Sequence, residues 1–203
     1  MTKYGNLLYG TVILLLLTTI RLQAKSMSQD TLPFYNIPDY PSTYSGAHVL
    51  ARSIDGLGFR YHWATEGLTV PDYNYNAGNG SRSVDETMDH LYSLSEMIKN
   101  AVLGIPNVRP SVTTVMTRTE RREATLANLK AASDRLHSYG EEALADMVII
   151  FQRGEKKSEV PFWHLLNGPL ADAMWHCGQI VAHRRAAGNP MPSGVNVFMG
   201  TKQ

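Results

Sequence analysis

Three side chains of types that commonly bind metal ions occur at helical spacing in this sequence. Asp172 and His176 are four residues apart, so on a helix both side chains project from one face, about one turn apart. His90 lies on an apolar stripe of an earlier helical segment, which directs its imidazole toward the interior. Helical bundles hold metal ions between such groups on facing helices. An isolated Asp/His pair is more often a surface or capping contact, so spacing alone leaves both interpretations open.

A second polar group precedes this one in the chain. His62 and Glu66 are also four residues apart, and Asp55 lies about two turns earlier on the same side. The arrangement indicates either a second ligand pair or a general base with its orienting partner. Glu66 is the candidate catalytic residue, because a carboxylate here is positioned to face the open end of a helical bundle. The alternative is an ion pair on the helix surface.

Composition excludes several classes of site and partner. The chain has one cysteine, Cys177, so it has no intramolecular disulfide and no multi-cysteine zinc or iron–sulfur site. We expect Cys177 to be a small buried hydrophobic residue rather than a ligand or nucleophile. The 19 basic and 18 acidic side chains give a formal net charge of +1. Nucleic acid is therefore not an expected partner.

Four segments show apolar residues at helical spacing. They cover about residues 50–68, 83–104, 118–139 and 168–188. The second begins with a capping box, in which Ser83 and Glu86 satisfy free backbone N–H groups, and Gly104 ends it. Residues 147–163 are expected to form a short hairpin or extended segment before the last helix. The pattern predicts an all-α fold, a four-helix bundle, whose long linkers leave the topology open.

Other conspicuous side chains are expected to have structural roles. Arg121, Arg122, Glu123 and Lys130 should face water on the third helix. His183, Arg184 and Arg185 should be solvated at the end of the last helix, where the helix dipole favours positive charge. We also expect a structural role for His164. We expect three tryptophans to pack in the core or at its rim: Trp63, Trp163 and Trp175.

The N-terminal residues have the pattern of a secretory signal. Lys3 is followed by an apolar run over residues 7–20, and Ala24 supplies the small residue at a cleavage site. The alternative is a membrane anchor, but 14 residues are fewer than the ~20 that span a bilayer as a helix. We therefore expect a signal peptide over residues 1–24, a Pro/Tyr-rich extended arm over 25–45 and a helical domain over 46–203. The cleaved protein should be exported, periplasmic or extracellular, without a stable membrane span.

Three short stretches carry a family resemblance. They are His-Cys-Gly-Gln at 176–179 with Arg-Arg at 184–185 and Gly-Asn-Pro at 188–190, Arg-Ser at 82–83 with Asp-His-Leu at 89–91, and the run at 61–68. The first resembles the last helix of the DinB-like (damage-inducible) superfamily, in which a histidine precedes Arg-Gly-Gln. The second resembles that family's second helix with its first metal histidine, and the third is similar to exported members. The resemblance covers about residues 46–190.

The resemblance implies a four-helix bundle, often a homodimer, with a metal ion held by three histidines. His90 and His176 take two of these positions, and the third falls on Asp172, so a carboxylate replaces an imidazole. Such a set suits zinc, nickel, iron(II) or manganese. Cys177 stands where the family has arginine.

The activity that the resemblance implies is metal-dependent thiol transfer or hydrolysis on a small-molecule substrate. Export counts against thiol transfer, because the small thiols that such enzymes use are cytoplasmic. The alternative is a metal-free helical bundle that binds a small molecule or a protein.

Overall fold

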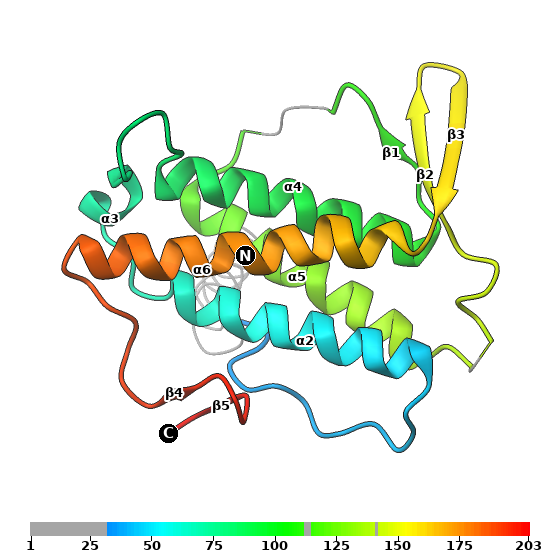
Figure 1. The fold of residues 1–203 in the computed structure, drawn as a ribbon, viewed down its shortest axis with the longest axis horizontal. Helices are drawn as coiled ribbons and strands as arrows, with labels where there is room; N and C mark the ends of the chain where they lie inside the picture. The colour runs from blue at the N-terminus through cyan, green and yellow to red at the C-terminus, as the bar shows by residue number, and fades with distance from the viewer. Residues whose placement is uncertain (1–31, 112–114, 141) are drawn as a thin grey trace, which may run out of the picture. The chain divides into compact units, whose positions relative to one another are not determined.

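The computed structural model describes residues 32–111, 115–140 and 142–203, and these residues are mostly helical (Figure 1). Four long helices dominate them: α2 (Gly46–Thr65), α4 (Val84–Leu103), α5 (Arg118–His137) and α6 (Ala171–Ala186). Helices α2 and α4 each pack against both α5 and α6. The prediction of a mostly helical protein is confirmed. The expected signal peptide lies outside the described residues.

Shorter elements connect or follow the long helices. These elements are α3 (Val70–Asn74), β1 (Asn107–Val108), β2 (Val148–Arg153), β3 (Lys156–Pro161), the π-helical turn η1 (Leu166–Leu170), β4 (Val195–Asn196) and β5 (Thr201–Lys202). Strands β2 and β3 pair antiparallel, with Val148 opposite Pro161 and Arg153 opposite Lys156, and β1 adds to β2 in parallel. The hairpin expected before the last helix is therefore present. Within the described residues, no helix is long and apolar enough to cross a bilayer.

Local signals in the sequence explain where the helices begin and end. Ser83 caps α4 and forms the predicted capping box with Glu86, and Gly104 closes the helix in the left-handed region at φ 67°. Thr117 and Glu120 form an equivalent box on α5. Helix α6 starts later than predicted, at Ala171, because the chain bends at Gly168 and Pro169 cannot donate a backbone hydrogen bond.

The core lies between the long helices. On α4 the buried residues follow the predicted stripe, with Val84, Met88, Leu91, Ser95, Ile98 and Val102 all at most 2% exposed. Helix α2 is buried on most of its circumference, because α5 and α6 cover one side and the N-terminal arm covers another. The arm, residues 32–45, contains no helix or strand. It is held on α2 by His62 Nδ1, which donates to Pro33 O at 2.8 Å, and by burial of the Phe34 ring against Gly58.

Two arginines that the sequence placed in water are buried. Arg121 forms ion pairs with Asp85 and Asp89 of α4, so it lies in the α4–α5 contact instead of on the surface. Arg184 is 1% exposed and donates hydrogen bonds to the carbonyl oxygens that end α2. Its neighbour Arg185 is exposed, as predicted. Lys130 is also exposed, whereas Arg122 and Glu123 are only half-exposed.

The aromatic and histidine expectations also need correction. Trp63 is 5% exposed and packs as predicted, but Trp163 and Trp175 are 75% and 73% exposed. Both lie outside the helix contacts, so they contribute little to the core. His164 is exposed as well. His183 is half-buried, with its ring 5.5 Å from that of Tyr75, and is not fully solvated.

Candidate metal centre

The structure brings His90, Asp172 and His176 together where α4 packs against α6 (Figure 1). His90 Nε2 lies 3.0 Å from Asp172 Oδ2, and His176 Nε2 lies 3.2 Å from Asp172 Oδ1. The two imidazoles meet edge to face, with ring centroids 4.7 Å apart and an interplanar angle of 87°. Both Nε2 atoms therefore converge on one carboxylate.

Gln179 contacts one of the two ring nitrogens of His176. Its side-chain oxygen Oε1 lies 2.7 Å from His176 Nδ1. A carbonyl oxygen accepts, so Nδ1 must donate, and the neutral imidazole then has a bare lone pair at Nε2. That lone pair faces Asp172 Oδ1, which is also an acceptor. The contact therefore requires a proton or a metal cation between the two atoms.

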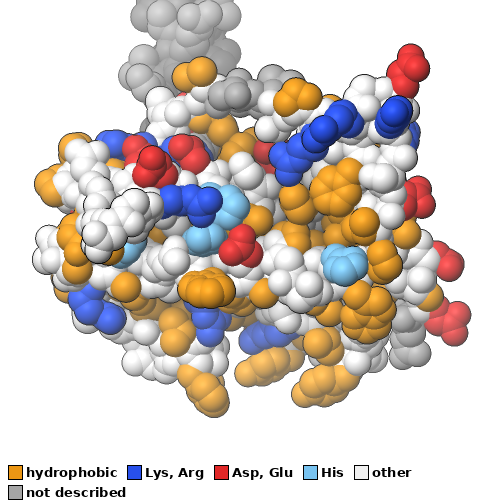
Figure 2. Space-filling view, turned by 45° about the horizontal axis from the view of Figure 1, so that its top comes forward, with side chains coloured by type: hydrophobic (Ala, Val, Ile, Leu, Met, Phe, Trp, Pro, Cys, Tyr) orange, Lys and Arg blue, Asp and Glu red, His pale blue; other side chains and the backbone are white. Residues whose placement is uncertain are grey.

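The cluster is accessible from solvent. The side chains of His90 and Asp172 are 30% and 42% exposed, and that of His176 is 11% exposed. Figure 2 shows histidine side chains at the surface of the molecule beside acidic and basic side chains. The Asp172 carboxylate and the His90 ring are therefore partly in contact with solvent, whereas His176 is largely covered.

The spacing of the three groups suits a single metal ion. Metal–nitrogen and metal–oxygen bonds of about 2.0–2.2 Å allow ligand atoms on one ion to lie at most ~4.4 Å apart. One ligand atom from each of His90, Asp172 and His176 lies within 4.8 Å of the other two. Small side-chain rotations close that difference. The Gln179 contact with His176 is the type of outer hydrogen bond that orients metal-binding histidines.

The residues of the second polar group contact three different partners. Glu66 accepts from Arg122 Nη2 at 2.6 Å, and His62 is engaged by Pro33 of the arm. Asp55 accepts from Ser133 Oγ at 2.5 Å across the α2–α5 contact. The three side chains thus have different partners, and among the described residues they are not part of the His90 cluster. A catalytic role for Glu66 stays a prediction.

Cys177 follows His176 in the sequence but points into the core. It is 2% exposed, and burial raises the pKa of its thiol to about 12. A neutral, enclosed thiol is neither a nucleophile nor a metal ligand. The prediction of a small buried hydrophobic residue is confirmed.

Sequence reasoning did not include Gln179 among the site residues. The signal was present, because Gln179 is three residues after His176 and so shares its side of the helix. The sequence motif His-Cys-Gly-Gln includes Gln179 but assigns no role to its side-chain amide. Its role becomes apparent once the contact with Nδ1 is known.

Comparisons of the chain with protein-family models, curated proteins and solved structures gave no match. The DinB-like resemblance therefore rests on the sequence motifs alone. The functional interpretation rests on the contacts among His90, Asp172, His176 and Gln179.

Proposed function

We propose that His90, Asp172 and His176 bind one divalent metal ion, and that the chain is an exported DinB-like enzyme of the thiol-transfer or hydrolysis type. The observation that carries the proposal is the contact between His176 Nε2 and Asp172 Oδ1 at 3.2 Å. In the neutral ring that donates Nδ1–H to Gln179, this nitrogen has no proton, and a metal cation would satisfy the nitrogen and the carboxylate together. The donor set suits zinc, nickel, iron(II) or manganese.

The packing of the long helices supports the proposed family architecture. Each of α2 and α4 contacts α5 and α6, which is the neighbour relation of a four-helix bundle. Bundles of this kind build metal sites from inward His and carboxylate groups on facing helices. His90 on α4 and the Asp172/His176 pair on α6 likewise come from two packed helices, at a partly exposed position.

Three protein ligands suggest a catalytic rather than a purely structural site. A divalent ion with an open coordination position lowers the pKa of a bound water or thiol and so supplies a nucleophile. The residues of the chain bind and orient: Gln179 fixes the tautomer of His176, and the exposed edge of Asp172 leaves room for a small-molecule substrate. Trp175 is exposed beside His176 on α6 and offers an apolar surface to such a substrate.

Metal analysis of protein without a histidine tag tests the proposal. The full chain is expressed, purified in the form that the host exports, and analysed by mass spectrometry for zinc, nickel, iron and manganese. We expect about one ion per chain in the wild type and none in the double variant His90→Ala/His176→Ala. His164→Ala is the matched control, because His164 is an exposed histidine outside the cluster. It should retain the metal.

The alternative function follows from the same contact. If His176 carries a second proton, Asp172 accepts from both imidazoles and the cluster is a hydrogen-bonded link between α4 and α6. The chain is then a metal-free binding module. Absence of metal from wild type and variant, including after incubation with each ion, would establish that alternative and exclude the metal-dependent enzyme.

A further inference from the structure

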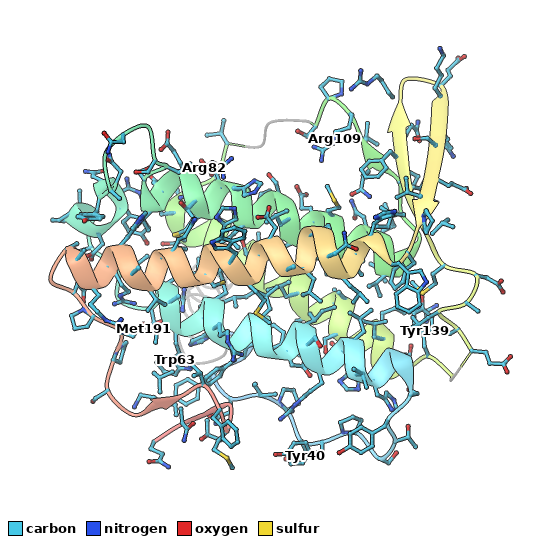
Figure 3. All side chains as sticks on the ribbon, viewed as in Figure 1. Tyr40, Trp63, Arg82, Arg109, Tyr139 and Met191 are labelled. Atoms are coloured by element: carbon cyan, nitrogen blue, oxygen red, sulfur yellow. The ribbon has the colours of Figure 1, made fainter. Side chains whose placement is uncertain are left out.

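Two histidines outside the His90 cluster lie together where α2 begins and α5 ends. His48 is in the first turn of α2, and His137 is the last residue of α5. Their ring centroids are 5.7 Å apart, with an interplanar angle of 38°. Figure 3 shows Tyr139, which follows α5, at the end of the helices where α2 starts. Both imidazoles are partly exposed, so the pair is in contact with solvent.

The contacts of His48 leave one of its ring nitrogens free. Nδ1 lies 2.8 Å from Thr43 Oγ1 and 3.1 Å from Thr43 O. A carbonyl oxygen only accepts, so the neutral tautomer that satisfies both contacts carries its proton on Nδ1. Nε2 of that ring then has a lone pair, and among the described residues it has no hydrogen-bond partner. A neutral imidazole nitrogen of this kind is the commonest metal ligand in proteins.

A buried carboxylate faces His137. Asp55 is 1% exposed and lies two turns after His48 on the same side of α2. Ser133 Oγ donates to its Oδ1 at 2.5 Å, whereas its Oδ2 lies 3.6 Å from His137 Nε2. Among the described residues, Asp55 forms no ion pair with a lysine or an arginine. An ionised Asp55 therefore requires a positive charge on the side of His137, either a second proton on that ring or a metal ion bound to it.

The separation of the two rings suits two imidazoles on one ion. With metal–nitrogen bonds of about 2.0–2.1 Å, two imidazoles on a tetrahedral ion have ring centroids roughly 5–6 Å apart. The 5.7 Å between His48 and His137 lies in that range. An ion on His137 Nδ1 leaves the proton of this ring on Nε2, facing Asp55, which is the usual order of carboxylate, histidine and metal. The C-terminal end of α5 also favours a positive charge.

We propose that His48 Nε2 and His137 Nδ1 bind a second divalent metal ion, of the type that imidazoles prefer, copper or zinc. Asp55 is a positioning residue, because it contacts the His137 ring and not the ion. The ion links the beginning of α2 to the end of α5, so its binding stabilises the folded chain. This site shares no residue with the metal centre proposed above, and neither site depends on the other.

Copper binding tests the proposal in a chain that lacks the other candidate site. The protein is prepared without a histidine tag and with the substitutions His90→Ala/His176→Ala. One equivalent of copper(II) is added, and pulsed electron paramagnetic resonance counts the imidazoles that bind it. We expect two imidazoles. His48→Gln and His137→Gln, each added to this background, should reduce the number to one. The matched control His164→Gln alters an exposed histidine outside both sites and should leave two.

Calorimetry with zinc supplies the second readout. The background protein should bind about one ion per chain, and His48→Gln and His137→Gln should each weaken this binding at least about tenfold. Asp55→Asn should weaken it about 10–100-fold while copper still binds two imidazoles, because Asp55 acts through the His137 ring. Circular dichroism should show every variant folded.

Two results would overturn the proposal. One is a copper spectrum of the background protein without coupling to two imidazoles, which is decided without any change at position 48 or 137. The other is a zinc affinity that is unaltered by both His48→Gln and His137→Gln. Either result would assign the positive charge beside Asp55 to a second proton on His137. Neither would bear on the His90 centre, which metal analysis of the wild type tests separately.

Discussion

Replacing the buried Arg184 with methionine should destabilise the protein by about 3–5 kcal/mol. Its Nη1 donates to the carbonyl oxygens of Trp63, Ala64 and Glu66 at 3.1, 2.9 and 2.9 Å. Its Nε donates to Asn189 O at 2.7 Å. The last carbonyls of a helix have no partner within that helix. One side chain of α6 therefore completes the C-terminal end of α2.

The magnitude follows from two opposing contributions. Each of the four hydrogen bonds has a charged donor and is worth about 1.5–3 kcal/mol, which sums to roughly 6–12 kcal/mol. Burying the charged guanidinium costs several kcal/mol in the wild type, and the methionine variant avoids this cost. The avoided cost offsets part of the loss of the hydrogen bonds. Methionine fills most of the volume of the arginine stem, so the cavity contribution is small. The free energy of unfolding should therefore fall by about 3–5 kcal/mol, the amount typical of breaking a buried charged network.

Urea denaturation followed by circular dichroism measures the effect. Arg184→Met and the matched control Arg185→Met alter adjacent arginines, one buried and one exposed. We expect the control to remain within about 0.5 kcal/mol of the wild type. A change below about 1 kcal/mol for Arg184→Met, with an unaltered dependence on urea, would refute the assignment of Arg184 as the cap of α2.

Three further outcomes are expected. Gln179→Leu should lower metal affinity about 10–100-fold, because His176 loses its orienting partner; competition with a chelating dye measures this. Burial lowers the pKa of His62 below its ordinary value of 6.5, so the unfolded chain binds a proton there more readily than the folded one. The free energy of unfolding should accordingly fall as the pH drops below about 6.5, and His62→Gln should reduce that dependence. Cys177 should react with a thiol reagent only after unfolding, because it is buried and its pKa is raised to about 12; reaction at the rate of a free thiol in folded protein would contradict its placement.

Helix positions were predictable wherever a local signal was sufficient. The limits of α4 follow from the capping box at Ser83 and the left-handed Gly104, which need no knowledge of the rest of the molecule. The start of α6 was placed too early, because Gly168 and Pro169 form a bend whose shape depends on how η1 packs on α4. Local chemistry thus predicts helix ends better than it predicts bends.

The candidate cluster was predictable for a related reason. A four-residue spacing brings Asp172 and His176 together, and an apolar stripe turns His90 inward, so two local patterns define three groups. Local sequence patterns do not determine which of two adjacent charged residues contacts a neighbouring helix. Arg184 and Arg185 have the same chemistry and adjacent positions, yet only Arg184 faces the end of α2. The spacing from Cys177 and Ile180 places Arg184 on the buried stripe of α6. It does not show that the side chain reaches the end of α2.

The polar contacts between the helices help to distinguish structural from functional groups. At Asp55 a hydroxyl donates to a carboxylate, and at Arg184 a guanidinium donates to carbonyls, so donors meet acceptors. At His176, Nε2 of the neutral ring would face the Asp172 carboxylate with an acceptor against an acceptor, so this contact needs a proton or a cation. A half-exposed ion pair adds little to stability, so stability does not explain the arrangement. The proposed divalent ion, taken up from solvent, would contact both groups at this partly exposed position.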